Sequence, residues 1–123
     1  MTNQQRLNLT DVINYHDFIL ALGTFLDGFK RSENKAELIA CPPQAEGAEK
    51  LHLCMLAAVT HKLASDYGLP TPEWVYSPIY KMPQPYFAFD TKNKEYQAFL
   101  FEDTPPEYAQ RNLFIGSNAF ERV

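Results

Sequence analysis

The segment from residue 49 to residue 67 has no clean polar face over most of its length. Placed on a helical wheel, its apolar side chains between Leu51 and Val59 surround the whole helix axis. Because a helix that is hydrophobic on every side is a buried one, we predict that this segment is the central helix of the fold. Gly68 and Pro70 mark its end, since glycine readily adopts the left-handed conformation after a last turn and proline cannot continue the helix.

An amphipathic pattern precedes the central helix. Thr10 is the expected N-cap of a helix whose last turn holds Lys30 and Arg31, two cations that suit the negative end of the helix dipole. Seven apolar residues recur at steps of three and four and share one third of the helical wheel: Tyr15, Phe18, Ile19, Leu22, Phe25, Leu26 and Phe29. We predict one amphipathic helix that packs on the core through this face. Residues 1–9 are polar and lack a cap, so we expect a mobile tail.

The C-terminal half is rich in prolines and aromatic residues. Two aromatic stretches, 86–89 and 96–101, are separated by the polar sequence TKNK, which suits a hairpin loop. Thr104 and Glu107 are spaced as a capping box, so a helix is expected from there to about Asn112.

A chain of 123 residues is long enough for one hydrophobic core and too short for two. We therefore expect residues 10–123 to form a single globular domain. The predicted fold class is mainly α: a compact helical domain around a buried central helix, with a small β-hairpin in the C-terminal half.

Composition and charge exclude several classes of partner. The net charge is -4, and the 11 Lys and Arg residues are scattered among 15 Asp and Glu residues, whereas nucleic-acid binding needs clustered cations. No apolar run reaches the length of a membrane span. The first residues carry no apolar signal sequence, and we expect Cys41 and Cys54 to be free thiols. These features predict a cytoplasmic protein.

The sequence contains no motif of a known catalytic site. It lacks a nucleophile elbow, a phosphate-binding loop, a zinc-protease motif and a dinucleotide fingerprint. His52 and Cys54 are two residues apart, so on a helix they point in different directions and do not share a metal. Burial is expected to raise the pKa of Cys54 and make its thiol inert. We therefore predict no catalytic residue, no metal and no cofactor.

Arg111 and Asn112 form a more suggestive polar patch, between Tyr108 and Leu113. A guanidinium group among aromatic residues is typical of a clamp for a carboxylate or of a protein interface. An arginine in this place equally suits the C-terminal dipole of the preceding helix. His61 is expected to be a half-buried histidine bonded to a carboxylate or a carbonyl, and the alternative is a general base.

Three stretches follow one another in a familiar order. They are H-K-L-A-x-x-x-G-L-P-x-P-x-W-V at 61–75, P-Y-F at 85–87 and P-P-E-Y-x-x-R-N-L-F-I-G at 105–116. With them the C-terminal half resembles a small uncharacterised domain of bacterial, often Gram-positive, proteins, some of which carry it behind a helix-turn-helix and look like regulators or antitoxins. The resemblance implies partner binding or regulation, but not DNA binding, because residues 1–60 show no helix-turn-helix. It also implies one cluster of five residues: His61, Trp74, Pro85, Arg111 and Asn112.

Two functional hypotheses follow. In the first, the chain is a small, cytosolic, non-catalytic protein-interaction or regulatory domain, such as the antitoxin-like member of a pair. Its aromatic C-terminal half then contacts a partner protein or a second copy of the chain, although these aromatic residues would equally fill the core. In the second, a small ligand-binding domain or enzyme uses His61 as a base and Arg111 as an anion clamp. The predicted binding residues are His61, Trp74, Tyr86, Arg111 and Asn112, with Trp74 and Tyr86 lining the pocket of the second hypothesis.

Overall fold

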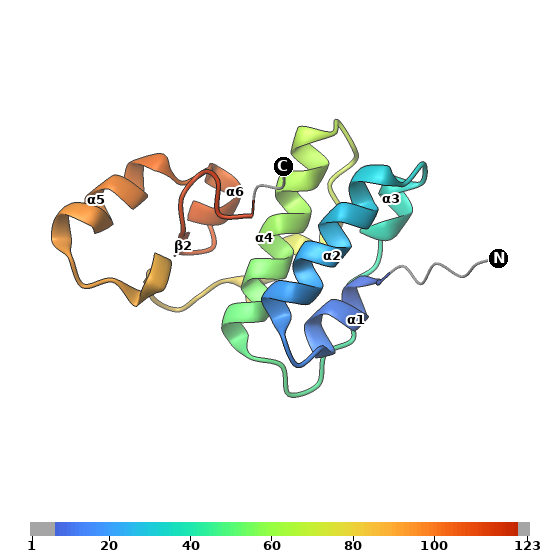
Figure 1. Cartoon of the computed structure of the whole chain (residues 1–123), viewed down its shortest axis with the longest axis horizontal. Helices are drawn as coiled ribbons and strands as arrows, with labels where there is room; N and C mark the ends of the chain where they lie inside the picture. Colours follow the sequence, from blue (N-terminus) through green and yellow to red (C-terminus); the bar gives the residue numbers. More distant parts are fainter. Residues whose placement is uncertain (1–6, 121–123) are drawn as a thin grey trace.

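The computed structural model describes residues 7–120 and shows a mainly helical domain. Within this range six α-helices are joined by loops and short 3₁₀ turns, together with one pair of two-residue strands. Helix α4 (Lys50–Asp66) lies in the middle, with the N-terminal helices on one side and the C-terminal segments on the other (Figure 1). The predicted fold class and the predicted central helix are confirmed.

Helix α4 is buried where the sequence lacks a polar face. All residues from 54 to 60 are buried. After the helix, Gly68 has a left-handed φ of 66°, and the amide of Leu69 donates to the carbonyl of Ala64 at 2.8 Å. This arrangement satisfies carbonyls of the last turn, so the helix ends where the sequence predicts.

The predicted N-terminal helix is interrupted, so the expectation of one continuous helix was wrong. Helix α1 (Leu9–Asn14) ends at Tyr15, and helix α2 (Phe18–Arg31) begins after a short break. Asp17 caps α2, because its carboxylate accepts a hydrogen bond from the amide of Leu20 at 3.2 Å. An N-cap residue has extended backbone, so a cap inside the apolar pattern ends one helix and starts another.

The cap of the first helix also differs from the prediction. Asn8 and Asp11 form a reciprocal capping box, in which each side chain accepts a hydrogen bond from the other residue's amide at 2.8 and 3.1 Å. Thr10 instead accepts a hydrogen bond from the amide of Gln44 at 2.9 Å. Leu9 is buried, so Asn8 and Leu9 belong to the folded domain rather than to the predicted tail. The rest of that tail, up to residue 6, lies outside the described residues.

The break changes which apolar side chains reach the core. Tyr15 and Ile19, assigned to the buried face, are 44% and 57% exposed. The other five residues of that predicted face are buried: Phe18, Leu22, Phe25, Leu26 and Phe29. Ring contacts join α2 to α4 near both ends, with Phe18 stacked on His52 at 4.2 Å and Phe29 edge-on to Tyr67 at 5.3 Å between ring centroids.

Short elements connect the helices around α4. Helix α3 (Lys35–Leu38) follows α2. Two 3₁₀ turns, η1 (Glu73–Tyr76) and η2 (Pro78–Tyr80), follow α4 and pack against it. The indole nitrogen of Trp74 donates to the carbonyl of Ile39 at 3.0 Å, so η1 is fixed to the end of the α3 segment.

The predicted β-hairpin does not form. Strand β1 (Tyr86–Phe87) pairs in parallel with strand β2 (Leu113–Phe114), which lies far along the chain. The second aromatic stretch belongs to helix α5 (Lys94–Asp103), whose N-cap Asn93 accepts a hydrogen bond from the amide of Tyr96 at 2.8 Å. The strand preference of aromatic residues reflects packing on a sheet surface, and without such a surface the local cap prevails.

Helix α6 (Pro106–Ala109) has Pro105 as its N-cap residue, so the predicted capping box at Thr104 was wrong. Thr104 instead ends α5, and its hydroxyl donates to the carbonyl of Leu100 at 2.6 Å. The same oxygen accepts a hydrogen bond from the amide of Gly116 at 2.9 Å. Thr104 thereby fixes the segment after β2 to the end of α5.

Replacing Thr60 with valine is expected to stabilise the domain. Within residues 7–120, the Thr60 hydroxyl is the buried side-chain oxygen that has no hydrogen-bond partner. A buried unsatisfied group costs about 1–3 kcal/mol, and valine keeps the shape while removing the hydroxyl. We expect Thr60→Val to raise the free energy of unfolding by about 1 kcal/mol in urea denaturation. The control Thr60→Ser keeps the hydroxyl and loses a methyl group, so it should be less stable than wild type; a destabilised valine variant would contradict the prediction.

Candidate functional site

A buried guanidinium group connects three elements beside α4. Arg111 follows α6 and is 4% exposed. Its Nη1 donates to the carbonyl of Glu107 at 2.7 Å and lies 3.1 Å from Nδ1 of His61. Its Nη2 donates to the carbonyl of Val75 at 2.7 Å. Nε2 of Gln110 also lies 3.1 Å from Nδ1 of His61. Arg111 therefore joins α4, α6 and η1 through one side chain.

The surroundings of His61 favour its neutral form. Burial lowers the pKa of His61, the charge of Arg111 lowers it further, and Glu107 acts in the opposite direction. Because the guanidinium group of Arg111 and the amide of Gln110 are both donors, Nδ1 presents its lone pair to them and the ring proton lies on Nε2. The ring of Tyr76 lies edge-on to the imidazole, with 5.4 Å between ring centroids.

This hydrogen bonding argues against His61 as a general base. A base needs a free lone pair within reach of the proton that it removes. In the neutral ring the Nδ1 lone pair is shared by Arg111 and Gln110, and Nε2 carries the hydrogen. The cluster therefore holds elements of the fold together, and its Nδ1 lone pair is not free to remove a proton from a substrate.

Two of the five predicted binding residues, His61 and Arg111, are in direct contact. The bond from Arg111 to Glu107 reaches a carbonyl of α6, which agrees with the predicted role at a helix C-terminus. Asn112 is the next residue, but its side-chain amide donates to the carbonyl of Met82 at 2.8 Å, and its φ of 62° is left-handed. Asn112 therefore fixes the loop before β1 and does not extend the cluster.

Trp74 and Tyr86 are placed elsewhere. The Trp74 ring packs edge-on against Tyr80, with 5.3 Å between centroids, and its indole nitrogen is already bonded to a backbone carbonyl. Tyr86 lines a separate cavity under α5 and η3 (Ala88–Asp90). The pocket of the second hypothesis, in which these two aromatic residues enclose His61 and Arg111, is therefore not assembled.

No family model, curated protein or solved structure matches the chain. The resemblance of the C-terminal half stays a prediction.

Among the described residues, none of the helices has the length and apolar character needed to cross a membrane. The same residues contain no group of three or more His, Cys, Asp or Glu side chains able to hold a metal ion. Cys41 is exposed, Cys54 is buried, both are free thiols, and burial raises the pKa of Cys54 as expected.

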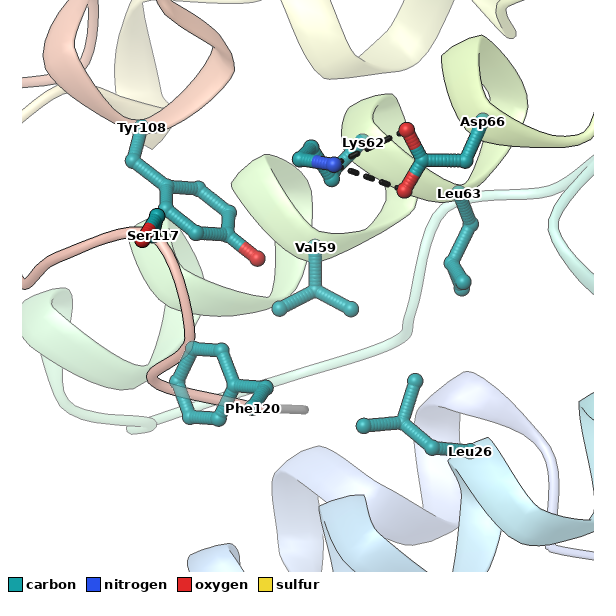
Figure 2. Close-up of a pocket in the computed structure, with 8 residues that line it drawn as sticks. All are labelled: Leu26, Val59, Lys62, Leu63, Asp66, Tyr108, Ser117 and Phe120. Atoms are coloured by element: carbon teal, nitrogen blue, oxygen red, sulfur yellow. Dashed lines mark hydrogen bonds and ion pairs between the residues drawn. The ribbon is translucent and has the colours of Figure 1, made fainter. Parts of the chain in front are cut away.

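A cavity of about 330 Å³ lies between α2, α4 and the C-terminal segment (Figure 2). Leu26 and Val59 supply apolar walls, and Lys62 and Asp66 form an ion pair of 2.7 Å on another side. Tyr108 is buried, and its ring lines the cavity together with the ring of Phe120 (Figure 2). Burial, together with the nearby carboxylates, raises the pKa of Tyr108 well above its usual range, so the phenol stays protonated. Sequence reasoning missed this cavity because its walls come from distant segments.

A third feature is an exposed aromatic surface on η3 and α5. We define the aromatic surface as Phe89, Tyr96 and Phe99, whose exposed fractions are 88%, 37% and 56%. The rings of Tyr96 and Phe99 are stacked with 6.2 Å between centroids. Phe89 and Tyr96 also line a cavity of about 440 Å³, whose apolar walls include Met55 and Ile115. Figure 1 shows α5 standing away from the N-terminal helices. The composition indicated an excess of aromatic residues, but not which of them would be exposed.

Acidification is expected to destabilise the domain through His61. The pKa of His61 is lowered in the folded state, so the unfolded state binds more protons. The stability contributed by neutral His61 is therefore complete above the unfolded pKa of about 6.5 and is lost as the pH falls through the folded pKa. Urea denaturation between about pH 7.5 and pH 5 should show wild type losing more stability than His61→Gln. Parallel losses in the two proteins would contradict this role.

Proposed function

We propose that this chain is a non-catalytic protein-interaction domain that binds a partner protein through its aromatic surface. The observation that supports the proposal is the exposure and the backbone conformation of Phe89. Its ring is 88% exposed, and its φ of 58° places a bulky residue in the left-handed region. Bulky residues rarely adopt this conformation, and strained residues of this kind cluster at functional sites such as ligand clamps and switch regions.

Phe89 costs the isolated domain stability in two ways. The left-handed conformation costs about 1–2 kcal/mol for a residue with a side chain. Leaving the ring in water forgoes about 2 kcal/mol that its burial would contribute. Asp90 is also left-handed, with a φ of 51°, so the strain covers two successive residues. Within residues 7–120 no ring contact of Phe89 offsets these costs, whereas a partner that covers the ring would recover the burial.

The adjacent cavity indicates what the partner presents. Its apolar walls, between Met55 and Ile115, suit an aliphatic or aromatic side chain of the partner. Charges of both signs surround the aromatic surface, with Asp90 and Lys92 on one side and Lys94 beside Glu95 at the start of α5. We therefore expect apolar contact, rather than the net charge of the partner, to supply most of the affinity.

The resemblance of the C-terminal half supports a more specific role. It implies a regulatory, antitoxin-like member of a pair in the bacterial cytoplasm. An antitoxin-like protein acts by covering a surface of its partner, and the aromatic surface suits this action. Self-association through the same surface is the competing outcome, and the experiment below separates the two.

The test uses variants that remove aromatic side chains from an exposed surface. Phe89→Gly removes the ring and tolerates the left-handed backbone, so its fold should be at least as stable as wild type. Phe99→Ser removes a second exposed ring of the aromatic surface.

Proteins cross-linked to the tagged chain in host cytosol are identified, and the captured partner is purified and titrated against each variant by calorimetry. We expect the double variant to bind at least about tenfold more weakly, because exposed aromatic anchors carry much of an interface's affinity.

Ile19→Ser is the matched control, because Ile19 is 57% exposed on α2 and lies outside the aromatic surface. It should bind the partner as tightly as wild type. Sedimentation of the purified chain tests the competing outcome, self-association. If wild type is a dimer and the double variant is a monomer, the aromatic surface binds a second copy of the chain instead of a different protein. If the double variant and wild type bind and sediment alike, the proposal is wrong.

A further inference from the structure

A small cavity adjoins the buried Arg111 and shares no lining residue with the cavity beside the aromatic surface. Its volume is about 110 Å³, and it lies between η1, η2 and the turn after α6. Its polar lining comes from six residues: Tyr76, Ser77, Tyr80, Lys81, Gln110 and Arg111. This set holds two cations and no carboxylate, so the cavity is chemically unlike the cavity beside Asp66.

Arg111 brings a buried positive charge to this cavity without an ion-pair partner. Within residues 7–120 no carboxylate lies within ion-pair distance of its guanidinium group. Its three hydrogen bonds go to two backbone carbonyls and to neutral His61. A guanidinium group has five N–H donors, so these bonds leave two, one on Nε and one on Nη2. A buried charge is costly unless it is paired, and a carboxylate or phosphate accepts hydrogen bonds from two such donors together.

Tyr80 adds a second unused donor. It is 5% exposed, and its hydroxyl makes no hydrogen bond with any residue between 7 and 120. Burial raises the pKa of this phenol, so it keeps its proton and remains a donor. Tyr80 lines the cavity, so an anion there can accept a hydrogen bond from its hydroxyl.

The remaining lining groups complete a site for a negative charge. Lys81 is exposed and lies at the mouth of the cavity, and Ser77 supplies a hydroxyl. On the neighbouring face of η2, Lys50 donates to the carbonyl of Ile79 at 2.5 Å and adds a further positive charge. Glu107 is the nearby acid that acts on Arg111 through space, but it does not pair with the guanidinium group.

From these contacts we propose that the cavity between η1, η2 and Arg111 binds a small oxyanion of phosphate size. Arg111 and Tyr80 supply hydrogen-bond donors to the site, and Lys81 is the exposed cation that attracts the anion. Phosphate is favoured over a carboxylate because the lining offers donors from at least three side chains, and phosphate has more acceptor oxygens than a carboxylate. The site is separate from the aromatic surface and does not depend on the proposed protein interaction.

Calorimetric titration of the full chain with inorganic phosphate tests the site, with sodium chloride at equal ionic strength as the reference. We expect a dissociation constant of about 1 mM or lower, and a rise in the unfolding temperature with phosphate that chloride does not produce. Titration with acetate distinguishes the two oxyanions. Acetate should bind more weakly; if it binds more tightly than phosphate, the site takes a carboxylate and the assignment to phosphate is wrong.

Two variants that preserve the fold locate the binding. Tyr80→Phe loses one hydrogen-bond donor and should weaken phosphate binding about fivefold. Lys81→Glu reverses an exposed charge and should weaken it by at least about tenfold. Lys94→Glu makes the same change of net charge on α5 and should bind phosphate as wild type does. The proposal is overturned if phosphate has no effect beyond that of chloride, or if Lys81→Glu and Lys94→Glu behave alike.

Discussion

Replacing Leu56 with alanine is expected to lower the free energy of unfolding by about 3 kcal/mol. Leu56 is fully buried at the middle of α4, between the N-terminal helices and the C-terminal segments. The truncation removes buried methyl groups and leaves a cavity that well-packed helices fill only in part. Urea denaturation of wild type and variant, analysed with the same slope, measures the loss.

The matched control is Leu20→Ala on α2. Leu20 has the same side chain but is 58% exposed, so its truncation should change stability by no more than about 0.5 kcal/mol. If the two alanine variants were equally stable, α4 would not be the centre of the core, and the interpretation of the fold would fail.

Replacing Arg111 with methionine is expected to lower the free energy of unfolding by about 3 kcal/mol. Methionine fills much of the same space but donates no hydrogen bond. The carbonyls of Val75 and Glu107 would each lose a side-chain donor, and unsatisfied groups of this kind cost about 1–3 kcal/mol each when buried. His61 would keep the hydrogen bond to Gln110. The loss should appear in urea denaturation at neutral pH, where His61 is neutral.

Arg31→Met controls for the removal of a positive charge, because Arg31 is exposed in the last turn of α2. There only the favourable interaction with the helix dipole is lost, which is worth about 0.3–1 kcal/mol. If Arg111→Met were as stable as Arg31→Met, the guanidinium group would not hold α4, α6 and η1 together.

Local patterns predicted the elements whose signals agree with one another. In α4, an apolar stretch without a polar face coincides with Gly68 at its end, and the helix forms as expected. In the N-terminal region two signals conflict: the apolar pattern runs through 15–18, but Asp17 is a good N-cap, and the cap prevails. The apolar pattern taken alone favours one continuous helix, so the break was not predicted.

The C-terminal half was predicted less well because its contacts are distant in sequence. The parallel pairing of β1 with β2 joins residues 86–87 to 113–114, and no turn signal can indicate such a pairing. Helix α5 buries little besides Leu100, so it lacks the periodic apolar face by which helices are recognised.

For the candidate site, the contact of His61 with Arg111 was predicted from the resemblance, whereas Trp74 and Tyr86 were misplaced. The misplacement has a physical cause: an aromatic residue packs equally well in a core, a cavity wall or an interface, so its type alone does not fix its location.

The way α5 is attached separates the residues of the aromatic surface from the helical core. Its segment leaves the fold at β1, which pairs with β2, and returns at Thr104, which is bonded to Gly116 just after β2. Between residues 88 and 103, only Ala88 and Leu100 are buried. Substitutions at the other positions of this segment therefore leave the helical core almost untouched. Under the proposed function, a change of partner would therefore need substitutions only in this segment, and the scaffold that carries it would stay the same.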